Sequence, residues 1–511
     1  MLAAAALVSV LLLQDAAAPV SRTAPPTPRE KAHQLLDDAL DFAPGAQPEV
    51  AASGLLRIGE NYDAFDSAKA LKILRQAFAA SLSIPPGSEE RREQAQSQIA
   101  LYTVPLSLPD AVSMLKSIVI STPAKDALRQ DPRQPAIEAA IALLVGKKQV
   151  DEAIQFMNEV GANGQYPFAA ARTIFEKLPP DDVRRPAIFS YALSAYTLRP
   201  APEFGEFLVK HWKEIPRSTA EAAIRQVVEN VLSQKDEGLN ETLAAEKGPI
   251  TLHGRHNVEL FDLMHVVRAI DPKRAEEILE GRPELKAALT RFPGGREDMG
   301  QLGNWSRSDG ALDPPDERST EMARVMADLD KVPDDLAEDK RFERYVEIAK
   351  AIRNPSLRLE ILSSTIEHAG EADPLTGKSI LSECIDLVKG VKDPQLRTQA
   401  WASIAASAHR LGDDKLAHEA LDHAFDDAAI LYKLDLDPDE PNPGPRDQWP
   451  STNAYRRVVI AGAKVFGVDA DVLLGRISDP DIALFARIEM AQALLDRPHN
   501  MWMTWSGKTI K

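Results

Sequence analysis

The histidines are the first residues in this sequence that could do chemistry, because neutral imidazole is a common zinc ligand. His418 and His423 belong to the segment HEALDH, which has one residue more than the helical ligand pair of a zinc protease. Histidines four positions apart share a helix face, whereas five positions turn the second side chain about 140° away. We therefore expect both histidines on the solvated face of a helix, opposite Ala417 and Leu421, and no metal site.

The densest histidine group is His253, His256 and His265, with Glu259 among them. On one helix His256 and Glu259 would be neighbours, but His265 would point to the opposite side. The four side chains therefore cannot converge on one ion. The pattern favours two histidines in a loop or helix cap and a third that is partly buried.

Asp435, Asp437 and Asp439 have the alternating acidic pattern of a calcium loop. Where that loop needs Gly for its sharp turn the sequence has Glu440, and where a bidentate Glu would close the site it has Arg446. The pattern favours a solvated acidic linker. An irregular, weak calcium site is the alternative.

Near the end of the chain, Ser506–Thr509 reads SGKT and resembles the end of a phosphate-binding loop. The glycine that such a loop requires five residues before Gly507 is Trp502, and no strand is predicted before it. We interpret the match as chance. The neighbouring segment Met501–Trp505 is expected to form a capping helix on the last repeat, with a docking segment as the alternative.

Cys384 is the only cysteine, which excludes an intramolecular disulfide and a cysteine-based zinc site. It lies on an apolar helical stripe with Leu381 and Ile385, so we expect a buried, inert thiol. The 77 acidic residues supply many carboxylate pairs, but only folded distances identify a catalytic pair. The sequence therefore assigns no catalytic, cofactor-binding or metal-binding residue.

The elements that position these residues are predicted to be helices. Apolar stripes at helical spacing alternate with short breaks that carry Pro, Gly or Asp, and no segment shows the period of two that marks a strand. Helical segments separated by short breaks of this kind are typical of helical hairpins. The predicted fold is all-α: a right-handed α-α superhelix, or helical-repeat solenoid, possibly in two parts.

Composition divides the chain at two breaks. Residues 293–319 are rich in Gly, Asp and Pro with few apolar residues, and 435–453 form a second break of similar character. The expected organisation is a signal peptide at 1–18, a Pro-rich spacer at 19–28, an N-terminal helical array at 29–292, a linker at 293–319, and a C-terminal helical-repeat array at 320–511 with an insertion loop at 435–453.

Four predicted helix starts share one local sequence, in which Asp or Asn can cap the helix and Pro occupies its first turn. They are Asp271-Pro272, Asn354-Pro355, Asp393-Pro394 and Asp479-Pro480. Their intervals are consistent with a unit of roughly 40 residues. A repeat of that length corresponds to a helical pair.

One such unit, Pro394–Leu431, resembles a tetratricopeptide repeat. The matching positions are Trp401, Ile404 and Ala405 on the first helix, Gly412 in the turn, and Ala417, Leu421, Ala424 and Phe425 on the second. The remaining units are also similar to HEAT repeats in length. The resemblance implies helical pairs stacked into an array with a concave surface that binds partners and assembles complexes.

The first residues, Met1–Leu13, form a short apolar run that is followed by the small residues Ala16–Ala18. This pattern predicts a signal peptide and a periplasmic or secreted protein. The run is too short to span a bilayer, and no later segment is long enough and free of charge, so no transmembrane segment is expected.

The chain carries 60 basic and 77 acidic residues, for a formal net charge of -17. A field of that sign repels phosphate backbones, so nucleic acid is not an expected partner. We expect a non-enzymatic helical-repeat scaffold, without a cofactor, that binds a protein or peptide in the cell envelope or outside the cell. The oligomeric state stays open.

The alternative is an enzyme that cleaves peptidoglycan or another envelope polysaccharide on an α-superhelix or α/α toroid. It would need a carboxylate in a deep cleft. A closed ring with buried acids favours the enzyme, and an open arc with exposed acids favours the scaffold.

Overall fold

The computed structural model describes residues 25–85, 87–120, 131–162, 165–236, 239–243, 250–299, 304–308, 317–329, 331–332, 336, 338–372, 374–439, 442 and 446–496. These residues form 22 α-helices, five short 3₁₀ helices and three short strands. The predicted all-α class is therefore confirmed.

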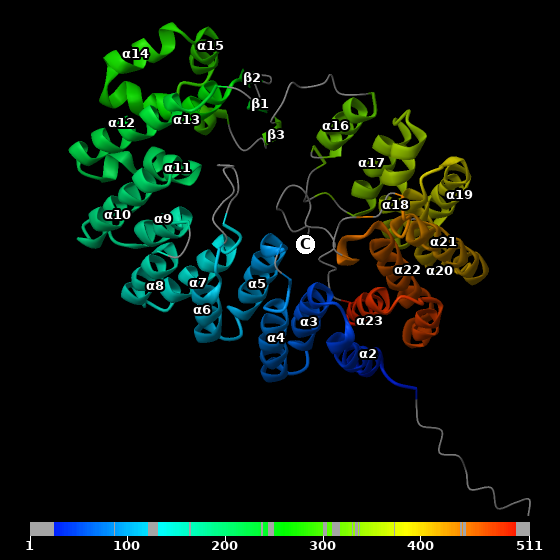
Figure 1. Ribbon diagram of the computed structural model, residues 1–511. Coiled ribbons are helices and arrows are strands. Elements are labelled where there is room, and N and C mark those ends of the chain that lie inside the picture. The colour runs from blue at the N-terminus through cyan, green and yellow to red at the C-terminus, as the bar shows by residue number, and fades with distance from the viewer. Residues whose placement is uncertain are drawn as a thin grey trace, which may run out of the picture.

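The N-terminal arm consists of the elements up to β3 (Figure 1). Its α-helices are α2 (Pro28–Phe42), α3 (Pro48–Tyr62), α4 (Ser67–Ser81), α5 (Glu89–Thr103), α6 (Leu108–Ser117), α7 (Gln134–Gly146), α8 (Val150–Ala162), α9 (Phe168–Lys177), α10 (Arg184–Leu198), α11 (Pro202–His211), α12 (Arg217–Ser233), α13 (Arg255–Ile270), α14 (Pro272–Glu280) and α15 (Pro283–Arg291). Its 3₁₀ helices are Ala43–Gly45, Trp212–Glu214 and Gly295–Met299.

The C-terminal arm consists of the elements from Glu317 onward. Its helices are α16 (Glu317–Leu329), α17 (Glu338–Lys350), α18 (Pro355–Ala372), α19 (Pro374–Gly390), α20 (Pro394–Arg410), α21 (Asp414–Asp435), α22 (Pro450–Phe466) and α23 (Pro480–Leu494). The 3₁₀ helices η4 (Arg446–Gln448) and η5 (Gly467–Arg476) flank α22.

Among the residues that the structure describes, a small antiparallel sheet departs from the helical pattern. Strands β1 (Asn240–Leu243), β2 (Ile250–His253) and β3 (Asn304–Ser308) pair in the order β2-β1-β3. The expectation that no segment forms a strand was wrong here. Strands this short leave too few alternating residues to stand out in the sequence, and β3 joins β1 from a distant segment.

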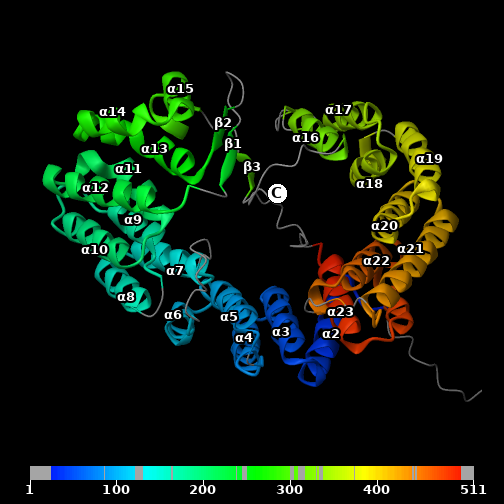
Figure 2. The ribbon, with the colours of Figure 1, turned by 45° about the horizontal axis from the view of Figure 1, so that its top comes forward.

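The helices of both arms lie in two layers along a curved row (Figure 2). Helices α3, α5, α7, α9, α11 and α13 each contact the next member of this series and lie nearer the centre of the molecule, and α18, α20 and α22 do the same in the other arm. We call these helices the inner layer. Helices α4, α6, α8, α10 and α12 lie on the outer side.

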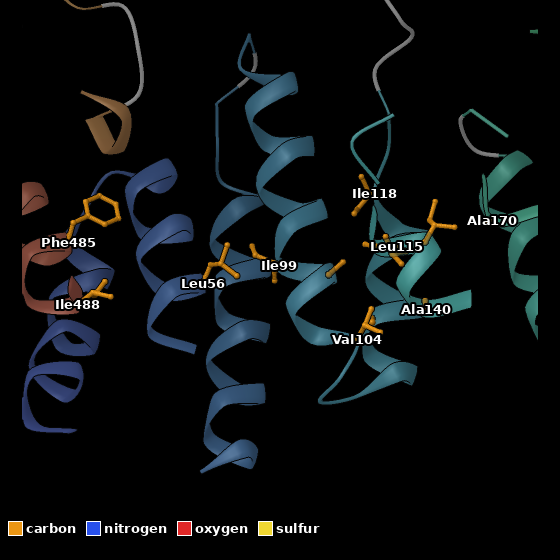
Figure 3. Packing of buried hydrophobic residues seen from close by; sticks show 14 of the residues in the cluster. Leu56, Ile99, Val104, Leu115, Ile118, Ala140, Ala170, Phe485 and Ile488 are labelled. Carbon is orange, nitrogen blue, oxygen red and sulfur yellow. The ribbon is translucent and has the colours of Figure 1, made fainter. Parts of the chain in front are cut away.

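One continuous apolar core runs between the layers of both arms. Figure 3 shows part of it, from Phe485 and Ile488 on α23 through Leu56 and Ile99 to Ala140 on α7. A smaller, separate cluster joins α16, α17 and the start of α18. Because each helical pair buries its apolar stripe against its neighbours, stacking itself supplies the core.

The four repeated helix starts are confirmed as helix caps. The Asp271 carboxylate accepts a hydrogen bond from Arg274 N, and Asp393 and Asp479 cap α20 and α23 in the same way. The side-chain oxygen of Asn354 accepts from Leu357 N at 3.1 Å. Each cap satisfies a backbone N–H that the first turn of a helix leaves unpaired, and the following Pro loses no bond there.

The unit length is shorter than roughly 40 residues in part of the N-terminal arm. Side chains 34 positions apart meet between successive units, as Arg172 does with Glu206 and Asn230 does with Tyr196. Elsewhere in the same arm the interval is closer to the expected value, since the inner helices α3, α5 and α7 begin at Pro48, Glu89 and Gln134.

The two ends of the described chain pack together. Helix α23 is buried on nearly all sides, and it contacts α2, α3, α22, η4 and η5. At the closest approach, a Cβ added to Gly54 of α3 would lie 2.8 Å from Leu484 Cδ2 on α23. A glycine here lets the α3 backbone approach α23. We call this junction the terminal seam.

Candidate functional site

The two histidines of the HEALDH segment lie where the helical spacing placed them. Both His418 and His423 are exposed on α21, opposite the buried Leu421. The His418 ring stacks on Phe466 with centroids 4.8 Å apart, and the His423 ring lies 4.7 Å from Trp401. The predicted surface position is confirmed, and each imidazole covers an aromatic ring.

The second histidine group diverges, as helix geometry predicts. His253 Nδ1 lies 2.7 Å from a Glu284 carboxylate oxygen, whereas His256 Nε2 lies 2.9 Å from the backbone oxygen of Gln234. Burial is the main cause that lowers the pKa of His265. Each histidine therefore has its own surroundings, and among the described residues no three His, Cys, Asp or Glu side chains are grouped to hold a metal ion.

Asp435 is not part of a solvated linker, which corrects the expectation for this residue. It is buried at the end of α21, where its carboxylate accepts hydrogen bonds from Ser451 N at 2.9 Å and Asn442 Nδ2 at 3.0 Å. Asp437 accepts from Asp439 N at 3.0 Å. The carboxylates of Asp435 and Asp437 therefore serve different local bonds, because Asp435 satisfies the start of α22 while Asp437 accepts a bond within the following turn.

Cys384 is buried, and burial raises the pKa of its thiol to about 12. The thiol is therefore protonated at neutral pH, which confirms the expected inert residue. Residues 1–24 and 497–511 lie outside the described residues, and with them the predicted signal peptide, Met501–Trp505 and Ser506–Thr509.

The terminal seam holds a buried cluster of charges that sequence reasoning missed. Glu489 of α23 is fully buried and pairs with both Arg57 of α3 and Arg456 of α22. Arg456 Nε donates to Glu489 Oε1 at 2.9 Å. At the edge of the seam, Lys31 Nζ contacts an Asp471 oxygen at 2.5 Å. The two guanidinium groups offset the desolvation of the carboxylate, so the cluster joins both arms.

A cavity of about 90 Å³ lies beside this cluster, between α3, α5 and η4. We call it the junction pocket. Its polar lining consists of Glu49, Ser53, Arg91, Gln94, Gln98, Asp447 and Gln448. Its apolar lining consists of Ala52, Leu56, Ile84, Ala95 and Ile99. Because α3 and η4 come from opposite ends of the sequence, the pocket exists only when the seam is formed.

Asp447 is the residue of the pocket lining whose pKa is shifted by burial. Burial raises the pKa of its carboxyl, while a hydrogen bond from Ser53 Oγ at 3.1 Å and the nearby Arg57 oppose that change. A carboxyl with a raised pKa in a cavity is a candidate hydrogen-bonding or proton-donating group. Asp447 lies in the insertion loop 435–453, where the sequence showed no signal for it.

The inner layer carries a second polar feature across α7, α9 and α11. Arg172 Nη1 donates to Glu206 Oε2 at 3.2 Å, and Glu138 lies on the other side of Arg172. Burial raises the pKa of Glu138, and the Arg172 charge opposes it. We call Glu138, Arg172 and Glu206 the inner strip. Their interval of 34 is visible in the sequence and could have been found as a repeat of charged positions.

His211 occupies a charged cluster at the end of the same helices. Its Nδ1 lies 2.7 Å from Glu214 Oε1 and its Nε2 lies 3.0 Å from Glu176 Oε1. Lys210 also contacts Glu176 at 2.7 Å, and Arg185 pairs with Glu214. The hydrogen bond with His211 is the main cause that lowers the pKa of Glu214. Lys210 and Arg185 therefore engage the same two carboxylates that contact His211, and the cluster joins the ends of α9 and α11.

An open depression of about 700 Å³ lies on α8, in the outer layer, and Arg184 at the start of α10 borders it. Its charged groups are paired, Arg184 with Asp151 at 2.8 Å and Glu159 with Lys116. Its lining includes no residue of the inner strip or of the terminal seam.

Within the described part of the chain, no helix is long and apolar enough to cross a lipid bilayer. The chain matches no known protein family, and no curated protein matches its sequence either.

Proposed function

We propose that this chain is a helical-repeat scaffold whose inner layer binds an extended segment of a protein or peptide partner. The observation that carries the proposal is the inner strip. Glu138, Arg172 and Glu206 occupy equivalent positions of three successive inner helices, and they present alternating charges along the row. A repeated polar surface suits a ligand that runs across several units, as in other stacked-helix arrays.

The dimensions of the junction pocket support binding over catalysis. Pockets that enclose a small-molecule ligand usually measure about 300 to 1,000 Å³, whereas this one measures about 90 Å³. The carboxylates of Glu489, Glu206 and Glu214 lie against Arg or His side chains. For Glu214 the hydrogen bond with His211 lowers the pKa, which favours the charged carboxylate over the proton-donating acid.

The way in which the helical pairs stack is also part of the proposal. We take the stacked pairs to form a right-handed α-α superhelix that resembles tetratricopeptide or HEAT arrays, supported by inner and outer layers and by the recurring interval of 34 residues. We also propose that the protein works in the cell envelope or outside the cell. The apolar run Met1–Leu13 followed by Ala16–Ala18 supports this address.

The second candidate is the polysaccharide-cleaving enzyme, and one observation favours it. The two ends of the described chain close on each other around buried acids, and Asp447 in the junction pocket has a raised pKa. A general acid works best when its pKa is raised toward the working pH, and burial shifts Asp447 in that direction. The pocket is small, and Glu49, the other carboxylate of its described lining, pairs with Arg91 at 3.4 Å. For these two reasons we place the enzyme second to the scaffold.

The test is affinity capture from envelope extract with the mature chain, beside a hydrolysis screen on peptidoglycan and polysaccharides. Arg172→Glu reverses the middle charge of the inner strip and should weaken partner retention about tenfold or more, because like charges then lie side by side. Arg225→Glu, an equal charge change at an exposed position of α12, is the matched control and should retain the partner.

The enzyme is tested in the same experiment by Asp447→Asn, which removes the acid and keeps the shape of the side chain. Turnover of a saccharide that this change abolishes, with no protein retained, would refute the scaffold. A partner retained by Asp447→Asn and lost by Arg172→Glu would support it.

A further inference from the structure

The junction pocket lies in the same layer of helices as the inner strip. Its walls α3 and α5 are followed in the inner layer by α7, which carries Glu138 of the inner strip. A segment bound along α11, α9 and α7 would therefore continue toward the pocket. The pocket is small enough to take one side chain and not a whole ligand.

The charges that line the pocket already have partners. Arg91 Nη1 lies 3.4 Å from Glu49 Oε2, which joins the two charged groups at the rim. The Asp447 carboxyl accepts the Ser53 hydroxyl, and Arg57 lies nearby. A charged ligand would compete with Glu49 for Arg91, or with Ser53 and Arg57 for Asp447, whereas a neutral polar group can bond to the lining without replacing these partners. The lining therefore favours a neutral ligand.

The remaining polar groups of the lining are amides and an acid. Gln94, Gln98 and Gln448 are exposed, and each side-chain amide can donate two hydrogen bonds and accept others. Asp447 can accept one more. Below them, Leu56 and Ile99 form an apolar floor. A carboxamide on a methylene stem matches this arrangement, because it donates and accepts at once and its stem is apolar.

We propose that the junction pocket binds the side-chain carboxamide of a glutamine or asparagine in the partner segment that the inner layer holds. This inference rests on the proposed function and adds the identity of one anchoring residue. The occupied pocket would also hold α3 against η4, so binding there would stabilise the terminal seam.

The experiment uses the full mature chain with ¹³C-labelled isoleucine methyl groups, since Ile84 and Ile99 line the pocket. The probe is glutamine with an acetylated N-terminus and an amidated C-terminus. The same capped form of methionine is the control, because it matches the length of the side chain and lacks the carboxamide. Capped glutamate, capped lysine and N-acetylglucosamine test charged side chains and the saccharide alternative.

Capped glutamine should shift both methyl signals with a dissociation constant in the millimolar range and bind about fivefold more tightly than capped methionine, since one net hydrogen bond has about that effect. Ala95→Leu, which fills the pocket, should abolish the shifts, and Gln98→Met should remove the preference for glutamine. Ala142→Leu on the exposed side of α7 is the matched control and should change neither.

Equal binding of glutamine and methionine, or tighter binding of a charged probe or of N-acetylglucosamine, would overturn the inference. The same experiments distinguish failure of this inference from failure of the proposed function. If Arg172→Glu releases a captured protein and Ala95→Leu does not, the scaffold stands and the carboxamide anchor fails. If capped glutamine binds and no protein is captured, the amide preference stands and the scaffold fails.

Discussion

Arg57 and Glu489 form an ion pair across 432 positions of the sequence. Arg57 lies in the second helix of the described chain and Glu489 in the last, so the pair joins the two arms at the terminal seam. Glu489 is fully buried and Arg456 contacts it from a third helix. Removal of this carboxylate would leave the buried Arg456 without the carboxylate that it pairs with, and it would also break the pair with the partly exposed Arg57.

Glu489→Gln should therefore lower the free energy of unfolding by about 3 to 5 kcal/mol, because it breaks a buried pair from one side. Urea unfolding followed by circular dichroism measures the change. Asp471→Asn is the control, since it removes the partly exposed partner of Lys31 at the same seam and should cost less than about 1 kcal/mol. Equal losses in the two variants would show that Glu489 does not hold the arms together.

Asp447→Asn should alter the pH dependence of stability. Burial raises the pKa of the Asp447 carboxyl in the folded chain, so the folded state binds its proton more tightly than the unfolded state does. The stability that the folded state gains from holding this proton is fully present below the unfolded pKa of about 3.9. It is lost as the pH rises through the raised pKa of the folded state. The wild type should therefore lose more stability between pH 4 and pH 7 than Asp447→Asn does.

Thermal unfolding of both chains at pH 4 and pH 7 checks this prediction. Asparagine can still accept the Ser53 hydrogen bond, so the variant isolates the charge of the carboxyl. Parallel curves for the two proteins across this range would mean that Asp447 titrates as an ordinary surface acid.

Leu421→Ala should cost about 2 to 5 kcal/mol, because Leu421 is 2% exposed and packs in the seam between α20 and α21. The neighbouring Asp422 has a side chain that is 69% exposed and reaches only Arg476, so Asp422→Ala should cost less than about 0.5 kcal/mol. Denaturant midpoints of both variants give the comparison. Two unchanged midpoints would contradict the assigned face of α21.

If the proposed signal peptide is removed, the protein from its own host should begin between about Ala16 and Val20, because small residues after an apolar run are the usual place of cleavage. Mass spectrometry of the purified chain reads the N-terminus directly. Recovery of intact Met1 in the cytosol would contradict the proposed export.

The sequence by itself determined the helices, their caps and the surface of α21. Apolar residues at helical spacing and Asp-Pro starts act within one turn, so Asp393 and Asp479 cap the helices at the predicted residues. The same local geometry separated His256 from His265 and placed His418 on the solvated face. Cys384 was predictable because its neighbours on the helix are apolar.

Only the tertiary structure decided which distant residues meet. Strand β3 joins β1 through backbone hydrogen bonds that leave no side-chain pattern in so short a segment. Asp435 looked solvated in the sequence and is buried, because α22 begins beside it. The junction pocket draws Ser53 and Asp447 from opposite ends of the chain, and no local pattern encodes a contact across 394 positions. Such contacts depend on how all the helices between the two ends of the chain pack together, and that packing is a property of the whole folded chain.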